Sequence, residues 1–187
     1  MRYNELTFQG RNAVLEAFRS GKTIDKLFIL DGCQDGPIKS IVREAKKTDA
    51  IINYVDKERL DRLAGTGHHQ GVVAIGAAYE YAEVEDILAA AKEKGEDPFI
   101  FILDEIEDPH NLGAIIRTAN LAGAHGVIIP KRRAVGLTAT VAKTSAGAIN
   151  YTPVAKVTNI SQTIEELKKQ GLWFVCADMG GETMYNL

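Results

Sequence analysis

Cysteine is scarce in this 187-residue sequence, which holds two such residues, Cys33 and Cys176, far apart in the chain. Neither belongs to a Cys-x-x-Cys pair or a Cys/His cluster, which argues against a disulfide framework and against a zinc site. Long apolar runs are also missing. The run from Phe99 to Leu103 is far too short to span a bilayer, and the N-terminus lacks the pattern of a secretory signal. We therefore expect a cytoplasmic protein with reduced thiols, no membrane association and no metal centre.

A strong excess of positive charge is absent as well. The net charge is −3, which by itself disfavours a nucleic-acid partner, because contacts with phosphates need lysine and arginine. The charge is unevenly distributed, since most of the acid lies between Glu80 and Asp108, whereas the basic triplet Lys131-Arg132-Arg133 lies outside that stretch. A local patch of this kind can bind RNA despite a negative total, although a solvated loop is an equally good interpretation.

The first part of the chain alternates helical and extended patterns. We predict helices over 12–18 and 37–47, a short helix capped by Asp56, and strands over 26–30, 51–55 and 72–75. A polar link and an alanine-rich helix ended by Gly95 follow. The sequence therefore predicts a small N-terminal α/β domain over residues 1–77 and a linker with a leading helix over 78–97.

The alternation restarts at residue 98. We predict strands over 99–103, 126–129 and 172–176, and helices over 112–122, 138–145 and 160–170. Repeated strand-helix units predict a parallel sheet flanked by helices, so the fold class is α/β in both parts. Because the chain ends soon after the last predicted strand, we interpret residues 98–187 as an incomplete domain.

The segment from Asp104 to Gly123 has the richest chemistry. It follows a strand and opens a helix, which is where open α/β sheets place ligands. Asn111 is predicted to cap that helix, which would leave backbone N–H groups free to bind a ligand. We expect one stripe of the helix to face the core, formed by Leu112, Ile115, Ile116, Ala119 and Gly123.

Gly113 and Arg117 lie one turn apart on the flank of that stripe. A glycine beside a guanidinium would let a sugar or phosphate approach bare backbone and be held by a forked donor. In the alternative interpretation, Gly113 permits close helix packing and Arg117 is a solvated charge. The residues by themselves favour neither interpretation.

Residues 111–119, Asn-Leu-Gly-Ala-Ile-Ile-Arg-Thr-Ala, resemble the first signature motif of the SpoU-type (TrmH-like) RNA ribose 2′-O-methyltransferases of the SPOUT superfamily. Gly-Arg-Asn-Ala-Val at 10–14 and His-Gln-Gly-Val-Val at 69–73 are typical of members with an N-terminal substrate-binding domain. The segment 143–148 also fits, so the resemblance covers essentially the whole chain.

This resemblance implies an α/β-knot methyltransferase domain behind an RNA substrate-binding domain, S-adenosylmethionine as methyl donor, and a homodimer at full length. The second and third motifs of the family normally follow the region where this chain ends. The resemblance therefore implies that the knot is incomplete here and that these 187 residues by themselves are inactive.

The resemblance also implies roles for individual residues. Arg117 and Asn111 are expected at the catalytic centre, where a cation stabilises the charge that develops on the ribose 2′-oxygen. For Arg11, Asn12 and Ser145, a structural role is about as well supported as contact with RNA. The expected substrate-binding residues are Arg11, Asn12, Gly113, Lys143 and Ser145, the expected donor-binding residue is Ala177, and no metal is implied.

The expected activity is methylation of a ribose 2′-hydroxyl, with a guanosine of large-subunit ribosomal RNA as the favoured substrate and transfer RNA as the alternative. A binding-only module for RNA is a second hypothesis. A Rossmann-type nucleotide enzyme is disfavoured, because neither G-x-G-x-x-G nor G-x-x-x-x-G-K-[ST] occurs in the sequence.

Overall fold

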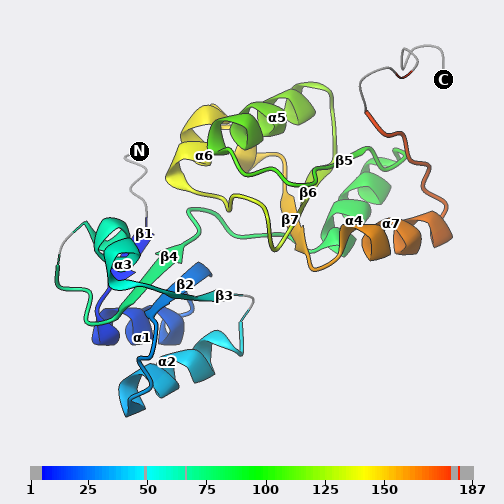
Figure 1. The fold of residues 1–187 in the computed structure, drawn as a ribbon. Helices are drawn as coiled ribbons and strands as arrows, with labels where there is room; N and C mark the ends of the chain where they lie inside the picture. The colour runs from blue at the N-terminus through cyan, green and yellow to red at the C-terminus, as the bar shows by residue number, and fades with distance from the viewer. Residues whose placement is uncertain (1–5, 49, 66, 178–180, 182–187) are drawn as a thin grey trace.

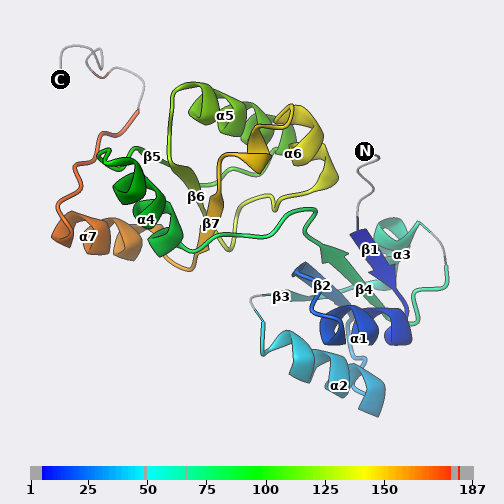
Figure 2. The same cartoon turned by 180° about the vertical axis from the view of Figure 1, so that it is seen from behind.

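The computed structural model describes residues 6–48, 50–65, 67–177 and 181, and contains two α/β units (Figures 1 and 2). We call residues 6–76 the N-terminal unit and residues 84–169 the C-terminal unit. The elements are, in chain order, β1 (Leu6–Gln9), α1 (Arg11–Arg19), β2 (Ile24–Leu30), α2 (Gly36–Ala45), β3 (Ile51–Val55), α3 (Lys57–Ala64), β4 (Val72–Gly76), α4 (Val84–Lys94), β5 (Ile100–Ile102), α5 (Pro109–Leu121), β6 (Gly126–Pro130), α6 (Ala139–Thr144), a 3-10 turn (Ala148–Asn150), β7 (Val154–Val157) and α7 (Ile160–Lys169).

The N-terminal unit is built on a mixed sheet with the strand order β1-β4-β2-β3. Strands β2 and β3 are parallel, and β4 runs antiparallel to both β1 and β2. Side chains of β2 alternate between the two faces: Leu27 and Ile29 join the core under α1 and α2, whereas Phe28 packs with Leu60 of α3. Helices therefore cover both faces of this sheet.

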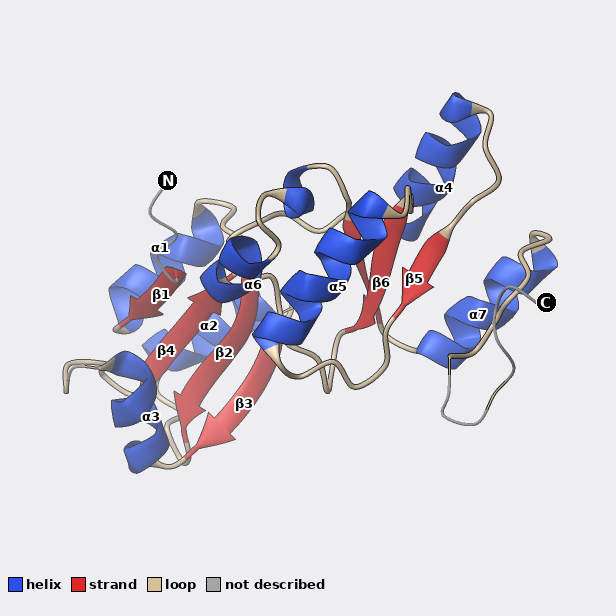
Figure 3. Ribbon diagram, turned by 90° about the horizontal axis from the view of Figure 1, so that it is seen from above, coloured by secondary structure: helices blue, strands red, loops and turns tan. Residues whose placement is uncertain are grey.

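The C-terminal unit contains a parallel sheet with the strand order β5-β6-β7, in agreement with the predicted fold class. On β6, Val127 and Ile129 pack in the cluster that includes α5, and Ile128 packs with Ile87 of α4 and Leu167 of α7. Helices α5 and α6 thus lie on one face and α4 and α7 on the other (Figure 3). None of the described helices is long and apolar enough to cross a membrane.

Most of the predicted elements are confirmed, and local chemistry explains where they begin and end. Asp56 caps α3 by accepting a hydrogen bond from the backbone N–H of Arg59 at 2.7 Å. Gly95 ends α4 in the left-handed conformation, with φ +70°. The sequence analysis missed β1 and β7, which are short strands of four residues each.

Three predictions are wrong. Residues 172–176 form no strand: no described strand pairs with them, and Trp173 and Val175 are 97% and 70% exposed. Their apolar composition suggested a strand, but strand preference depends on packing against neighbours.

Asn111 is not the cap of α5. Asp108 accepts from the backbone N–H of Asn111 at 2.8 Å, and Pro109, whose fixed φ suits the first helical position, starts the helix. Gly123, expected in the buried stripe, is exposed beyond the end of the helix.

A buried polar cluster joins the two units. The register of β2 against β4 shifts between Ile24 and Lys26, so Asp25 lies at a bulge, a feature that redirects a side chain. Asp25 is 4% exposed, and its carboxylate receives the ammonium of Lys156 from β7 and the hydroxyl of Tyr81, the latter at 3.1 Å. Tyr81 in turn accepts from the backbone N–H of Leu137 at 2.9 Å.

Two further contacts close this cluster. The ammonium of Lys156 lies 4.2 Å from the centroid of the Tyr81 ring, within the range of a cation–π interaction. Gly136 leaves room for the carboxylate, because a Cβ at this position would lie 2.1 Å from Asp25 Oδ2. Desolvation raises the pKa of Tyr81 far above its ordinary value, and the neighbouring charge of Asp25 raises it further. The cluster therefore fixes the N-terminal unit against the C-terminal unit.

Candidate functional site

The carboxyl ends of β5 and β6 carry the segments that the sequence analysis singled out. The loop after β5 leads to Asp108 and the first turn of α5, and the basic triplet comes directly after β6. Parallel strands bring these ends to one edge, where open α/β sheets bind ligands. Arg133 Nη1 and Glu105 Oε1 lie 2.8 Å apart, so an ion pair joins the two loops.

Arg117 lies on the exposed side of α5. Within the described ranges its guanidinium has no hydrogen bond or ion pair, and Asn111 is exposed in the first turn of the same helix. Residues six apart on a helix are separated by about 9 Å along its axis and by about 120° around it. Long side chains lean toward the helix N-terminus, so Arg117 extends toward the turn that carries Asn111. A ribose that contacts both groups would have to span this separation.

Gly113 is buried against α6. A Cβ at this position would lie 2.6 Å from Thr144 Cβ and 2.9 Å from the carbonyl oxygen of Val141. The close packing of α5 on α6 therefore accounts for this glycine, as the alternative interpretation of the sequence proposed. The Cβ position of Gly113 faces α6 rather than open space. A contact of Gly113 with substrate therefore has no support from this packing and stays a prediction.

Lys143 and Ser145, at the end of α6, differ in their surroundings. Lys143 is exposed and can reach a ligand. Ser145 is fully buried, and its hydroxyl donates to the carbonyl oxygen of Ala142 at 2.9 Å. The expectation that this hydroxyl contacts phosphate is therefore unsupported, and the geometry fits the packing role instead.

Arg11 and Asn12 begin α1 in the N-terminal unit, away from α5 (Figures 1 and 2). Arg11 binds within its own unit: Nη2 lies 2.5 Å from Asp35 Oδ2, and Nε donates to the carbonyl oxygen of Gln70 at 3.2 Å. Its backbone N–H donates to Gln70 Oε1 at 3.1 Å. The two N-terminal motif segments thus meet at Arg11 and Gln70, and contact of Arg11 with RNA stays a prediction. Asn12 is exposed.

The expected donor-binding residue, Ala177, is exposed in the segment after α7 and belongs to no helix or strand. Residues 178–180, which follow it, lie outside the described residues. Across the described ranges, no group of three or more His, Cys, Asp or Glu side chains is arranged to hold a metal ion.

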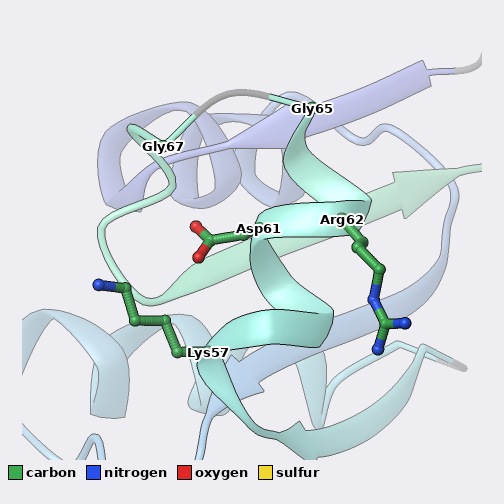
Figure 4. Close-up of a pocket in the computed structure, with 5 residues that line it drawn as sticks. All are labelled: Lys57, Asp61, Arg62, Gly65 and Gly67. Carbon is green, nitrogen blue, oxygen red and sulfur yellow. The ribbon is translucent and has the colours of Figure 1, made fainter.

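A pocket of about 480 Å³ lies beside α3 (Figure 4). Lys57, Asp61 and Arg62 line it together with Gly65 and Gly67; Lys57 and Asp61 point to one side of α3, and Arg62 points to the other. Its one carboxylate is engaged, because Asp61 Oδ1 lies 3.0 Å from Nε2 of His69, itself a buried side chain. This pocket lies on the N-terminal unit, distant from Arg117.

A groove of about 330 Å³ is lined by both units. The N-terminal unit supplies residues of β2, β3 and α3, and the C-terminal unit supplies the basic triplet and Ala134. Sequence reasoning identified the triplet but missed Lys26, Asn53 and Arg59. No sequence signal groups these three residues, because folding brings them together from separate elements. The lining residues are Lys26, Phe28, Ile51, Ile52, Asn53, Arg59, Lys131, Arg132, Arg133 and Ala134.

Comparison with known families matches both parts of the chain. Residues 98–187 match the SpoU rRNA Methylase family, and residues 9–82 match the family described as RNA 2′-O ribose methyltransferase substrate binding. YacO of Bacillus subtilis (strain 168), whose name places it in the TrmH family of tRNA/rRNA methyltransferases, is 54% identical over 169 residues. That match covers 90% of this chain and 68% of YacO. The chain belongs to the SpoU/TrmH family.

Other TrmH-family sequences agree with this assignment. A relative from Staphylococcus haemolyticus (strain JCSC1435) is 47% identical over 181 residues, which cover 97% of this chain and 72% of the relative. Solved structures are less similar. The AdoMet-bound rRNA methyltransferase of Sinorhizobium meliloti is 23% identical with a TM-score of 0.41, and the match covers 87% of this chain and 58% of that protein.

The SpoU methyltransferase AviRb of Streptomyces viridochromogenes, solved in complex with AdoMet, is 20% identical with a TM-score of 0.43. The match covers 89% of this chain and 59% of AviRb. This SpoU/TrmH-family chain therefore spans about three fifths of the length of these two solved proteins.

Proposed function

We propose that this SpoU/TrmH-family chain forms the RNA-binding and ribose-positioning part of an S-adenosylmethionine-dependent RNA 2′-O-methyltransferase. The observation that carries this proposal is Arg117, an exposed guanidinium without a protein partner among the described residues, within the family's first motif on α5. In the same proposal, residues 1–77 form the substrate-binding domain, residues 78–97 the linker and leading helix, and residues 98–187 the methyltransferase part.

Arg117 and Asn111 would act on the ribose. A 2′-hydroxyl is a weak nucleophile, so positioning contributes strongly to the rate, and negative charge develops on its oxygen as the proton leaves. The guanidinium of Arg117 would stabilise this charge, while the amide of Asn111 would orient the sugar. A guanidinium is ordinarily always protonated, so we assign Arg117 charge stabilisation rather than the role of general base.

S-adenosylmethionine would supply the methyl group from its sulfonium. We propose that its site lies outside the two pockets described above. Ala177 is exposed, and neither of the two pockets described above includes it. Both pockets are lined by lysine and arginine side chains, which disfavour a positively charged sulfonium. We therefore place the donor outside these two pockets, and we propose that the protein is a homodimer.

We propose a guanosine ribose of large-subunit ribosomal RNA as the substrate. An RNA substrate is supported by residues 9–82, which match a family described as RNA 2′-O ribose methyltransferase substrate binding. Transfer RNA is the second candidate, since YacO and the Staphylococcus haemolyticus relative are named as tRNA/rRNA methyltransferases.

A chimera tests this proposal. The 187-residue chain would be joined to the C-terminal residues of YacO that follow the matched region, and tritium transfer from labelled S-adenosylmethionine would be measured. We expect transfer to one of the two RNA classes, none from the 187 residues alone, and a loss of at least about 100-fold in kcat for Arg117→Ala.

Two controls separate the outcomes. Calorimetric binding of S-adenosylmethionine by the chimera shows that the donor site has formed, and retained RNA affinity in Arg117→Ala shows that the variant is folded. A chimera that binds the donor and RNA but retains full activity without Arg117 would refute the catalytic assignment. RNA binding without donor binding or transfer would favour a binding-only module.

A further inference from the structure

The groove between the two units carries an unusual set of side chains. Five cations line it: Lys26 and Arg59 from the N-terminal unit, and Lys131, Arg132 and Arg133 from the C-terminal unit. No carboxylate is among its lining residues. The chain as a whole has a net charge of −3, so this concentration of positive charge is local.

Two carboxylates that neighbour the groove residues are engaged in ion pairs. Glu105 pairs with Arg133 at 2.8 Å, and Asp25, which precedes Lys26 on β2, pairs with Lys156 inside the interunit cluster. Arg59 and Arg132 are exposed and have no side-chain hydrogen bond or ion pair among the described residues. The groove therefore presents cations that can exchange solvent for an anionic ligand.

The other lining residues of the groove fit a sugar-phosphate chain. The lining also contains the apolar residues Phe28, Ile51 and Ile52, and β3 is the last strand of its sheet, so its outer edge has no neighbouring strand among the described elements. Unpaired backbone groups of an edge strand and the side chain of Asn53 add polar partners for phosphate or ribose oxygens. An elongated polyanion would contact both units at once.

We propose that this groove binds the RNA backbone between the two units and positions the RNA relative to α5. The proposal rests on the function proposed above, and it assigns a second RNA contact separate from Arg117 and Asn111. The loop that carries the triplet follows β6 at the same edge of the sheet as the first turn of α5. RNA bound in the groove would thus lead toward the proposed ribose-binding flank.

Binding of the 187-residue chain to RNA tests this assignment. The probe is a fluorescein-labelled 30-nucleotide RNA hairpin, whose binding is measured by fluorescence anisotropy at a series of NaCl concentrations. Unfractionated transfer RNA is the unlabelled competitor. The test variant combines Lys26→Ala, Arg59→Ala and Arg132→Ala. The matched control combines Lys39→Ala, Lys92→Ala and Lys94→Ala, which removes three exposed cations outside the groove.

We expect the groove variant to bind roughly tenfold more weakly or worse in 100 mM NaCl, with the slope of log K against log salt reduced by about 2. The control variant should change affinity by less than about twofold, and both variants should keep the melting temperature of the parent chain. Arg117→Ala should leave this binding largely unchanged.

Two other results would refute the groove proposal, alone or together with the proposed function. Equal losses in the two triple variants would show that general charge, not the groove, attracts the RNA, and would refute the groove while leaving the proposed function intact. A parent chain without affinity for either RNA would refute both the groove and the RNA-binding part of the proposed function.

Discussion

Asp25 and Lys156 lie 131 residues apart in the sequence, yet their side chains form a buried ion pair. The exposed fraction is 5% for the Asp25 side chain and 12% for the Lys156 side chain. Such a pair joins β2 of one unit to β7 of the other. Removal of one partner leaves the other charge buried without compensation, which typically costs about 3–5 kcal/mol.

The ion pair leads to a first prediction about stability. Asp25→Ala and Lys156→Ala should each lower the free energy of unfolding by about 3 kcal/mol or more, whereas the double variant should lose much less than the sum. Urea unfolding monitored by circular dichroism measures these values. Strictly additive losses would show that the two side chains do not interact in solution.

Tyr81 gives a prediction about pH. Because its pKa is raised in the folded chain, the folded state keeps the phenolic proton when the unfolded state loses it. This contribution is fully present below the ordinary tyrosine pKa of about 10 and is lost as the pH rises above that value. The free energy of unfolding should therefore fall more steeply between pH 9.5 and 11 in the parent chain than in Tyr81→Phe. Equal slopes would contradict a buried, neutral Tyr81.

The contact of Gly113 with α6 gives a third prediction. An added Cβ would overlap Thr144 Cβ at 2.6 Å, so Gly113→Ala should destabilise the chain by about 1–3 kcal/mol, although alanine is the better helix former. The exposed Thr118→Ala on the same helix serves as the control and should change stability little. Thermal unfolding compares the variants, and a stabilised Gly113→Ala would show that α5 and α6 pack less closely.

Ser145 and Lys143 allow the packing and binding interpretations to be separated. Ser145→Ala should lower stability by about 1 kcal/mol, since it removes the buried hydrogen bond to Ala142, and should leave RNA affinity unchanged. Lys143→Ala should do the reverse, with intact stability and weaker binding of RNA. The same anisotropy assay and a urea titration measure both effects; loss of RNA affinity in Ser145→Ala alone would restore its predicted role in binding.

Hydrophobic periodicity and end signals were sufficient to predict most helices and the parallel sheet of the C-terminal unit. Periodicity was less informative where a segment is short or its partner is distant. Strand β7 has four residues, and residues 172–176 are apolar without a described strand beside them. The capping of α5 was misassigned because Asp108 and Asn111 are both good capping residues, and Pro109 decides between them.

The candidate site divides in the same way. The nine-residue motif on α5 is local, so sequence alone was enough to propose Arg117 and Asn111 as site residues. The groove depends on Lys26, Arg59 and the triplet, which come from three elements of two units and share no spacing in the sequence. The local sequence likewise could not show that Arg11 is engaged by Asp35 and Gln70, because Gln70 lies 59 residues away.

The bulge at Asp25 has a consequence for dissecting the protein. Cutting the chain between the two units would leave Asp25 without its ammonium partner and Lys156 without its carboxylate, and would empty the space beside Gly136 that the Asp25 carboxylate occupies. Each isolated half would then lack contacts that it has in the intact chain. Assays on isolated halves should carry Asp25→Asn or Lys156→Gln, so that the cut leaves no unpaired charge at the new surface.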